Sequence, residues 1–502
     1  MENPLKIAMI AAEAVPYAKA GGLADVVGAL PTVLQKLASD TIVIIPAYKA
    51  IHQEKFGVRP FERIPQFSVP MGPGLSSAQV FRAETPPGEP QFFFIGNKDY
   101  FFRDGIYDDP ITKEGYPDNM ERFLFFMKAS LEVIRRLGEP IDVIHCHDSQ
   151  TGLIPGYLRT NLRSDPFFAR TGTLFTMHNL GYQGVYPKES LYWAGIDYRH
   201  FYPNSPFEFW AKVNFMKVGI ECADLINTVS ETYAAEIQSS AEYGYGLEGV
   251  LRLRREDLYG IVNGIDYAEW NPETDPLIPA HYSAADLSGK TICKTELLRT
   301  LGLPPPDGRT PLIGIVSRLV DQKGMDLIAE SIEQIAKLNL QLVVLGTGQQ
   351  KYHDMFEFMA RRYPNKISIK LAFDNRVAHQ IEAGSDIFLM PSKYEPCGLN
   401  QLYSLRYGTV PVVRATGGLA DTVADYDPAG AGGTGFRFEK YSASDMMIAL
   451  NRALKAYSDA GRWRELMLRG MAQNWSWEES ARRYLKLYRL ILQKRISVSF
   501  VK

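Results

Sequence analysis

The residues best suited to chemistry form two copies of one short motif. Gly-Gly-Leu-Ala-Asp occupies positions 21–25 and recurs at positions 417–421. Each copy follows a strand-like run and begins a helix-like run. Paired glycines at such a turn let a ligand approach the backbone, and the free amides of a helix start attract an anion, usually a phosphate. Glycines that only allow tight packing explain one copy equally well, but a copy in each half of the chain favours phosphate binding.

Positive side chains near strand ends would strengthen such an anion site. Lys19 precedes the first copy of the motif and offers a point charge, with a solvated surface lysine as the alternative. Arg318 and Lys323 follow another strand-like run, and ligands of doubly wound sheets bind beyond the carboxyl ends of strands. A guanidinium group can fork onto a diphosphate, and the lysine adds a second charge. The alternative is a surface ion pair, and the strand-end position favours binding.

Two other strand ends carry histidines. His145, Cys146 and His147 run along one strand, whose alternate residues point to opposite faces, so a metal site is disfavoured. We expect His147 or Asp148 to face a ligand, although two hydrogen-bonded core histidines are the alternative. His178 lies in a polar, glycine-containing loop after the next strand. Such a loop suits a sugar, whose hydroxyls need several donors and acceptors.

A carboxylate lies in a loop between a strand and a helix in the second half of the chain. Glu395 precedes Pro396, which holds the glutamate backbone extended. The carboxylate suits hydrogen bonds to sugar or ribose hydroxyls, or alternatively it stabilises the start of the next helix. Cys397 is expected to line the same site without acting as a nucleophile, because no base stands beside it in the sequence.

Other phosphate motifs fail on their spacing. Residues 288–291, Ser-Gly-Lys-Thr, resemble the end of a P-loop, but the required earlier glycine is replaced by Ala284. Gly346 and Gly348 follow a strand, but the third glycine of a dinucleotide fingerprint is replaced by Lys351. These residues more simply mark a tight turn. A nicotinamide-dependent oxidoreductase is therefore disfavoured.

The elements that must position these residues alternate between strand and helix. This alternation predicts an α/β fold of two Rossmann-like, doubly wound domains with parallel sheets, facing a central cleft. We expect an N-terminal domain over 1–262, a C-terminal nucleotide-binding domain over 263–474, and a final helical segment, 475–502, that packs back on the first domain. The expected strands are Ile7–Ala11, Thr41–Ile45, Ile141–His145, Leu174–Met177, Asp224–Val229, Leu312–Ser317, Leu342–Leu345, Ile367–Leu371, Ile387–Met390 and Val410–Val413, and the expected helices are Asp118–Gly138, Met325–Lys337, Arg376–Ala383 and Gly398–Tyr407.

Composition excludes several classes of function. The 502 residues carry a formal net charge of −2, so no broad basic field is present to bind nucleic acid. The four cysteines are scattered and form no Cys-x-x-Cys pair, which favours reduced thiols in a cytoplasmic protein. We expect no leader sequence and no membrane span. The oligomeric state stays open.

Taken together, the motifs resemble those of bacterial glycogen synthases and the related plant starch synthases. The resemblance extends over nearly the whole chain. It rests on residues 19–25, 147–148, 177–179, 263–266, 317–318, 322–324, 394–399 and 416–421.

The resemblance implies a type-B glycosyltransferase fold and a specific reaction. The donor would be ADP-glucose and the acceptor the non-reducing end of an α-1,4-glucan, with retention at the anomeric carbon and with no metal or other cofactor. Asp148, His178, Arg318, Lys323 and Glu395 would be the catalytic residues. The substrate-binding residues would be Lys19, Gly21, Gly22, Asp25, Asn263, Phe373, Cys397, Gly398, Leu399, Thr416, Gly417, Gly418 and Leu419.

Within this set, the resemblance assigns roles by position. Lys19, Arg318 and Lys323 would hold the diphosphate, together with Gly22 and the amides of Gly418 and Leu419. Asp148 and His178 would line the glucosyl and acceptor side, Glu395 would contact the donor sugar, and Phe373 would stack on adenine in place of the family's usual tyrosine. Ser149 stands where the family usually has tryptophan, which puts an aromatic platform for the acceptor in doubt.

The mechanism and the donor leave alternatives. Retention requires a covalent intermediate, for which Glu395 is the candidate nucleophile, or same-face attack in which a leaving phosphate oxygen takes the acceptor proton. We favour same-face attack, with hinge closure around the donor. Alternative functions are a transferase that uses UDP-glucose, including one that makes sucrose, and a non-catalytic glucan-binding protein.

Overall fold

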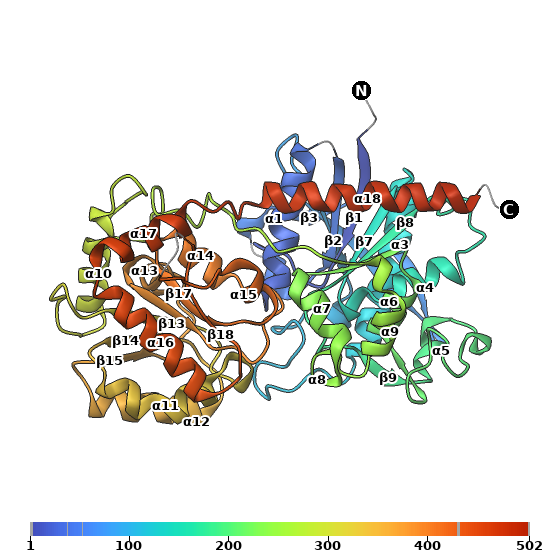
Figure 1. The fold of residues 1–502 in the computed structure, drawn as a ribbon. Coiled ribbons are helices and arrows are strands. Elements are labelled where there is room, and N and C mark those ends of the chain that lie inside the picture. Colours follow the sequence, from blue (N-terminus) through green and yellow to red (C-terminus); the bar gives the residue numbers. More distant parts are fainter. Residues whose placement is uncertain (1–3, 38, 53, 429–431, 500–502) are drawn as a thin grey trace. The chain divides into compact units, whose positions relative to one another are not determined.

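The chain folds into two compact units. The computed structural model describes residues 4–37, 39–52, 54–428 and 432–499. The first unit contains residues 1–229, 234–264 and 477–502, and the second contains residues 230–233 and 265–476 (Figure 1). The chain enters the second unit at Ile265 and returns to the first at Trp477, close to the boundaries at 263 and 475 that the sequence suggested.

The first unit is built on a mostly parallel sheet with strand order β12-β11-β8-β7-β1-β2-β6-β5-β3. Because β1 pairs with both β2 and β7, the chain order reverses between β1 and β7, and this is the switch point at which such sheets bind ligands. The strands are β1 Leu5–Ile10, β2 Ser39–Pro46, β3 Val58–Pro60, β4 Phe67–Met71, β5 Gly74–Ala83, β6 Gln91–Gly96, β7 Val143–His147, β8 Gly172–Met177, β11 Leu225–Thr228 and β12 Leu258–Gly260, with β9 Val185–Pro187 and β10 Lys212–Asn214 forming a separate pair.

The helix expected over Asp118–Gly138 is present in the first unit. The helix α3, Asn119–Leu137, has Gly138 at its C-terminus in the left-handed conformation that glycine favours. Asp118 precedes the helix but makes no side-chain cap bond; both carboxylate oxygens instead bind Arg103, at 2.7 and 2.5 Å. The other helices are α1 Gly22–Lys36, α2 Lys98–Phe101, α4 Leu153–Arg159, α5 Ser190–Ala194, α6 Phe215–Cys222, α7 Glu231–Ser239, α8 Ala241–Gly244 and α9 Glu248–Leu253.

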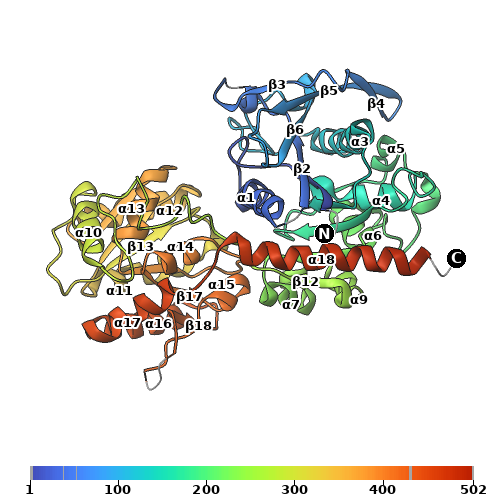
Figure 2. The ribbon, with the colours of Figure 1, turned by 90° about the horizontal axis from the view of Figure 1, so that it is seen from above.

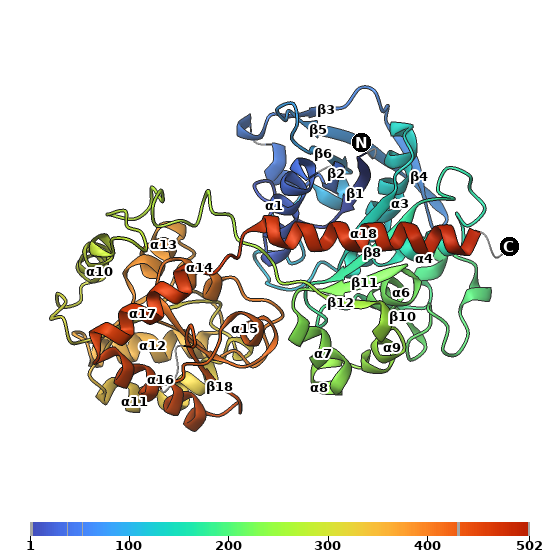
Figure 3. The same ribbon diagram turned by 45° about the horizontal axis from the view of Figure 1, so that its top comes forward.

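The last helix completes the core of the first unit. The helix α18, Trp477–Ser499, contacts α1, β7 and β8, and Figures 1 and 3 show it lying across this sheet. Trp477, Tyr484 and Tyr488 are buried in the same apolar cluster as Ile7 and Val143 of the central strands. This packing is the one that the sequence suggested for the C-terminal segment.

The second unit has a six-stranded, wholly parallel sheet with strand order β15-β14-β13-β16-β17-β18. Its switch point lies between β13 and β16, because the chain adds strands on one side of β13 and then on the other. The strands are β13 Leu312–Val316, β14 Gln341–Leu345, β15 Ile367–Lys370, β16 Ile387–Met390, β17 Val410–Arg414 and β18 Phe436–Phe438.

Alternate residues of these strands pack against helices on opposite faces of the sheet. Ile313 and Ile387 join the cluster that includes α11 and α16, whereas Leu312 and Phe388 join the cluster that includes α10 and α13. Both faces of the sheet are therefore apolar, as the continuous apolar runs of the sequence indicate. Figure 2 shows the helices that surround this sheet. The helices are α10 Ser288–Thr300, α11 Met325–Lys337, α12 Gln350–Arg362, α13 Asn375–Gly384, α14 Asn400–Arg406, α15 Gly417–Thr422, α16 Ala443–Tyr457 and α17 Ala460–Met471.

Two sequence motifs that we set aside as ligand sites have structural roles. Lys290, from the P-loop-like run, is buried and donates to the Ala383 carbonyl and Thr409 Oγ1. A Cβ atom at Gly346 would lie 1.9 Å from the Ser317 carbonyl oxygen, so this glycine allows two loops to pack closely. Within the described residues, no helix combines the length and apolar character that a membrane crossing requires.

Candidate functional site

The switch point of the first unit collects the polar residues that follow β1, β7 and β8. We call this the first-unit site; it comprises Glu13, Lys19, Gly21 and Gly22 after β1, Asp148 after β7 and His178 after β8. Because β1, β7 and β8 are adjacent and parallel, their carboxyl ends meet at one edge of the sheet. The sheet topology therefore brings together groups that are far apart in the sequence.

The start of α1 is exposed, and two of the backbone amides before it already donate to a carboxylate of the protein. Gly21 and Gly22 are exposed, and a Cβ atom at either position would meet no atom within 4 Å. The buried carboxylate of Glu13 accepts hydrogen bonds from the Gly21 amide, at 2.8 Å, and from the Ala20 amide. The amides of Gly22 and Leu23 have no acceptor among the described residues. The first copy of the motif thus leaves two amides and free space for an anion.

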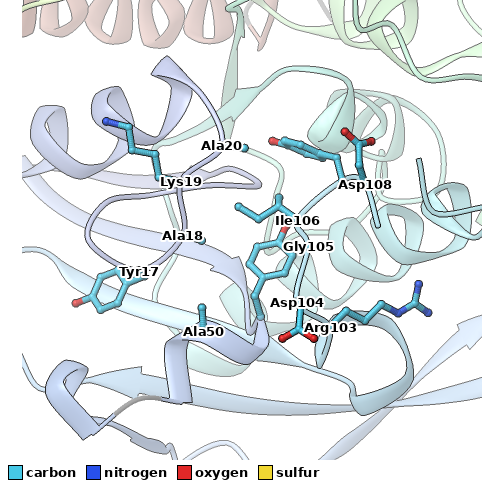
Figure 4. A pocket seen from close by; sticks show the side chains of 12 residues that line it. Tyr17, Ala18, Lys19, Ala20, Ala50, Arg103, Asp104, Gly105, Ile106 and Asp108 are labelled. Carbon is cyan, nitrogen blue, oxygen red and sulfur yellow. The ribbon is translucent and has the colours of Figure 1, made fainter. Parts of the chain in front are cut away.

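Lys19 lies beside a hollow of about 360 Å³. Its ammonium group pairs with Asp25 at 2.7 Å, and burial raises the pKa of Asp25. Figure 4 shows the segment around Lys19 on one side of this hollow and the segment around Asp104 and Asp108 on the other. Lys19 is thus held at the site by the aspartate of its own motif, and its contact with a diphosphate stays a prediction.

Asp148 joins the ends of β7 and β8. Its Oδ1 accepts the His178 main-chain amide at 2.7 Å, and its backbone has φ of +56°, a conformation that L residues rarely adopt. Burial raises the pKa of Asp148 to about 7, against hydrogen bonds from the amides of His178 and Asn179 that lower it. A backbone strained in this way is typical of functional sites.

The histidines differ in accessibility. His145 and His147 are fully buried, so the core alternative holds for these two, whereas His178 is partly exposed. Burial lowers the pKa of His178 to about 3, and it lowers the pKa values of His145 and His147 well below the usual value. All three imidazoles are therefore neutral near pH 7, and His178 offers hydrogen bonding rather than positive charge.

Ser149 is buried beneath the loop that follows β8. Its hydroxyl donates to the Tyr182 carbonyl at 2.8 Å, and a Cβ atom at Gly184 would lie 3.0 Å from the Ser149 Cβ. Gly184 therefore packs closely against Ser149. Tyr182 itself is 59% exposed, so the loop presents an accessible aromatic ring.

The second-unit site lies at the switch point between β13 and β16. It comprises Arg318 and Lys323 after β13 and Glu395 after β16. The Lys323 ammonium group donates to Glu395 Oε2 at 2.5 Å, and Ser392 Oγ donates to the same oxygen at 3.1 Å. Arg318 is exposed and donates to Gln322 Oε1 at 3.0 Å.

The charges of this site leave it suited to an anion. Within the part of the chain that the structure describes, no carboxylate lies within ion-pairing distance of Arg318. Lysine has three N–H donors, and the bond to Glu395 uses one. Glu395 lies well before the start of α14, so its role is in this loop and not at the helix start.

The second copy of the glycine motif is packed, unlike the first. Gly417 and Gly418 are buried, and Cβ atoms there would lie 2.0 Å from the carbonyl oxygens of Glu395 and Cys397, respectively. The Gly418 amide donates to the Glu395 and Pro396 carbonyls, and the Leu419 amide donates to Thr416. Contrary to the expectation of free amides, these glycines support the loop that carries Glu395. Their contact with a diphosphate stays a prediction.

The remaining predicted substrate-binding residues differ in accessibility. Phe373 is 92% exposed after β15 and presents an open ring face. Cys397 and Thr416 are buried, and Gly398 and Leu399 are partly exposed just before α14. Asn263, in the first unit, is also buried, and its Oδ1 has no hydrogen-bond partner among the described residues.

Sequence reasoning missed Glu13 as a site residue. The available signal in the sequence was that the charge of Glu13 interrupts an apolar stretch near the N-terminus. In the structure, Glu13 Oε1 accepts the Tyr107 hydroxyl at 2.6 Å while its other oxygen accepts the two amides before α1. Glu13 therefore fixes the loop that carries Lys19.

Comparison with known proteins identifies the family. Residues 6–253 match the family described as starch synthase catalytic domain, and residues 304–466 match glycosyl transferases group 1. The glycogen synthase of Koribacter versatilis is 45% identical over 491 residues, covering 98% of this chain and 99% of the relative. The glycogen synthase of Pseudothermotoga lettingae is 44% identical over 494 residues, covering 98% of this chain and 100% of the relative.

A solved structure agrees with these matches. The catalytic domain of Starch Synthase IV from Arabidopsis thaliana, bound to ADP and acarbose, superposes with a TM-score of 0.89 at 33% identity, covering 98% of this chain and 100% of that domain. A sucrose-phosphate synthase from Thermosynechococcus elongatus, at 17% identity and a TM-score of 0.59, shares the fold. This chain has two Rossmann-like units, and its similarity to these relatives extends over nearly its full length. It therefore belongs to the glycogen and starch synthase family of glycosyltransferases.

Proposed function

We propose that the protein transfers glucose from ADP-glucose to the non-reducing 4-hydroxyl of an α-1,4-glucan, with retention and release of ADP. The related Starch Synthase IV domain was solved with ADP and acarbose, which supports binding of a nucleotide and a glucan by members of this family. The relatives of the present protein described above are glycogen synthases from bacteria. We further propose that the reaction takes place in the cytoplasm.

The observation that carries the proposal is the pair of cations at the switch point of the second unit. Arg318 is exposed and lacks an ion-pair partner among the described residues, and Lys323 is anchored to a buried carboxylate. Both follow β13, where a doubly wound sheet binds nucleotides. Fixed cations of this kind stabilise the negative charge that develops on a leaving diphosphate. We therefore assign the donor to this site and require no metal, so that activity should persist in EDTA.

Glu395 is placed to hold its lysine rather than to attack the sugar. Its carboxylate is buried, pairs with Lys323 and accepts from Ser392. A carboxylate engaged by an ammonium group and a hydroxyl is a weakened nucleophile. These contacts support same-face attack, in which the acceptor hydroxyl passes its proton to the leaving phosphate oxygen. Trapping of a glucosyl-Glu395 adduct by mass spectrometry would contradict this mechanism.

The acceptor and the glucosyl ring are assigned to the first-unit site. Asp148 and His178 offer hydrogen-bonding groups at adjacent strand ends, and the exposed Tyr182 ring lies in the loop after β8. Carbohydrate recognition uses this combination of polar groups and an aromatic face.

Release of ADP is the direct test. ADP-glucose and UDP-glucose are each supplied with glycogen, and the nucleoside diphosphate and the lengthened glucan are measured. We expect ADP-glucose to be the better donor and the product to carry an α-1,4 linkage. Preference for UDP-glucose would reassign the donor, and absence of release with either donor would favour a glucan-binding protein.

Replacing Arg318 tests the donor site. We expect Arg318→Ala to lower kcat by about 100-fold or more at saturating ADP-glucose, because one fixed donor to a developing anion contributes roughly 3–4 kcal/mol. Arg361→Ala is the matched control, since Arg361 is an exposed arginine of α12 in the same unit. Near-wild-type turnover of Arg318→Ala would refute the assignment.

A further inference from the structure

Three histidines of the first unit form a continuous row that ends at the first-unit site. The rings of His145 and His147 lie 4.0 Å apart, and those of His147 and His178 lie 5.2 Å apart. A hydrogen bond of 2.9 Å joins His147 Nδ1 to His178 Nε2. Only His178 is partly exposed, so the row connects the buried core to the surface of the site.

The tautomer of His145 follows from its neighbours. Thr176 donates its only hydroxyl proton to Asn227 Oδ1 at 2.5 Å. The 2.6 Å contact between Thr176 Oγ1 and His145 Nε2 must therefore use a proton from the imidazole. His145 then carries its proton on Nε2, and its Nδ1 accepts the Tyr488 hydroxyl of α18 at 2.9 Å.

The tautomer of His147 follows from what its other nitrogen lacks. His147 Nε2 is buried with no hydrogen-bond partner among the described residues. Burial keeps both His147 and His178 neutral, so one of the two nitrogens that face each other carries a proton and the other accepts it. A proton on His147 Nε2 would leave a buried N–H donor unpaired, which native structures rarely tolerate. The proton therefore belongs on His147 Nδ1, which donates to His178.

We infer that His147 is a positioning residue that fixes the tautomer of His178. By donating to His178 Nε2, it places the His178 proton on Nδ1, for which no partner exists among the described residues. His178 then offers an N–H donor to a sugar oxygen and has no free basic nitrogen with which to accept the proton of the attacking hydroxyl. This inference rests on the proposed function for its consequence in catalysis, and it fits a reaction in which the leaving phosphate takes that proton.

The tautomer can be measured without any assay of activity. Long-range ¹H–¹⁵N spectra of the intact protein, labelled at histidine and recorded at pH 7, distinguish protonated from unprotonated ring nitrogens. Signals are assigned by comparison with single histidine variants. We expect His178 to be protonated at Nδ1 and His147 also at Nδ1. Protonation of His178 at Nε2 would overturn the inference even if the enzyme is fully active.

Two substitutions at His147 separate positioning from packing. The side-chain amide of His147→Asn can donate from near the original Nδ1 position, whereas His147→Phe fills the space without a donor. We expect His147→Phe to lower kcat about tenfold, equivalent to the loss of one hydrogen bond, with the KM for ADP-glucose unchanged. His147→Asn should restore most of kcat and retain the Nδ1 proton on His178.

A neighbouring residue supplies the control for strand packing. Cys146 is equally buried in β7 and lies outside the histidine row, so Cys146→Ala perturbs the same strand and leaves the hydrogen bonds of the row in place. We expect its kcat to stay within about twofold of wild type. Equal losses in His147→Asn, His147→Phe and Cys146→Ala would show a packing effect and overturn the positioning role. Failure of the proposed function would instead appear as absence of ADP release by the unmodified protein.

Discussion

At the residue scale, the two sites differ in how they treat charge. Arg318 is exposed, and the partly buried Lys323 is held by the carboxylate of Glu395. In the first unit, burial instead favours the neutral forms, since it raises the pKa of Asp148 to about 7 and lowers the pKa of His178 to about 3. A site that stabilises a diphosphate needs fixed positive charge, whereas a site that binds hydroxyl groups needs fixed donors and acceptors.

The pKa of Asp148 predicts a pH-dependent change in stability. Because its pKa is raised in the folded state, the group's contribution to stability is present at low pH and is lost as pH rises through about 7. Asp148→Asn removes this dependence, and asparagine tolerates the positive φ at this position. The melting temperature of the variant relative to wild type should rise between pH 5 and pH 9. A constant difference over this range would contradict the assigned pKa.

At the element scale, one motif does two different things. The glycines before α1 stand in open space, whereas those at α15 fit against the loop that carries Glu395. The aspartates also differ, because Asp25 pairs with Lys19 while Asp421 accepts the Thr232 amide at 2.9 Å. Identical local sequence therefore gives an open helix start in one unit and a packed one in the other.

This difference predicts opposite outcomes for matched glycine substitutions. Gly418→Ala should destabilise the protein by about 1–3 kcal/mol or more, because the added Cβ would lie 2.0 Å from the Cys397 carbonyl oxygen. Gly22→Ala should leave the free energy of unfolding within about 1 kcal/mol of wild type, but it should raise the KM of a substrate that approaches this backbone. Urea unfolding and steady-state kinetics measure the two effects. Equal destabilisation would contradict the distinction.

The packing of the terminal helix α18 predicts a large loss of stability when one of its buried side chains is truncated. Tyr488 is fully buried, and its hydroxyl lies 2.9 Å from His145 Nδ1. Tyr488→Ala should destabilise the first unit by about 3–5 kcal/mol, as other deletions of buried aromatic side chains do. Arg489→Ala, one residue along the same helix and exposed, should change the free energy of unfolding by less than about 0.5 kcal/mol. Thermal or urea unfolding distinguishes the two variants.

At the scale of the whole molecule, each unit has its own core. One large apolar cluster belongs to the sheet and helices of the second unit, and another combines the central strands of the first unit with α18. The nucleotide and diphosphate of the donor are assigned mainly to the second unit, through Arg318 and Lys323. Binding of ADP should therefore stabilise the second unit most.

Limited proteolysis with and without ADP tests this expectation. At roughly 100 times its Kd, a ligand adds about 2.7 kcal/mol to the stability of the state that binds it. We expect ADP to slow cleavage within residues 265–476 more than within residues 1–229, and Arg318→Ala to abolish the protection. Protection confined to the first unit would place the nucleotide there instead.

Apolar periodicity alone predicts the class of fold and the central strands of both sheets. The helix α11 has the predicted bounds, Met325–Lys337, and the predicted strand Ile387–Met390 is β16, because apolar periodicity records which faces are buried. The antiparallel strands β3, β4 and β5 were not predicted. Motif residues also indicated the strand ends at which Asp148, His178, Arg318, Lys323 and Glu395 lie, since polar residues at the ends of apolar runs are visible without coordinates.

Contacts between these groups depend on how the strands are arranged in the folded protein. The Lys323–Glu395 pair joins residues from β13 and β16, and the contact between His147 and His178 joins β7 and β8. Likewise, only packing distinguishes the open glycines at 21–22 from the buried pair at 417–418. Local sequence specifies the backbone of a turn, but the partners of that turn come from strands elsewhere in the chain, and the sheet topology decides which strands are adjacent.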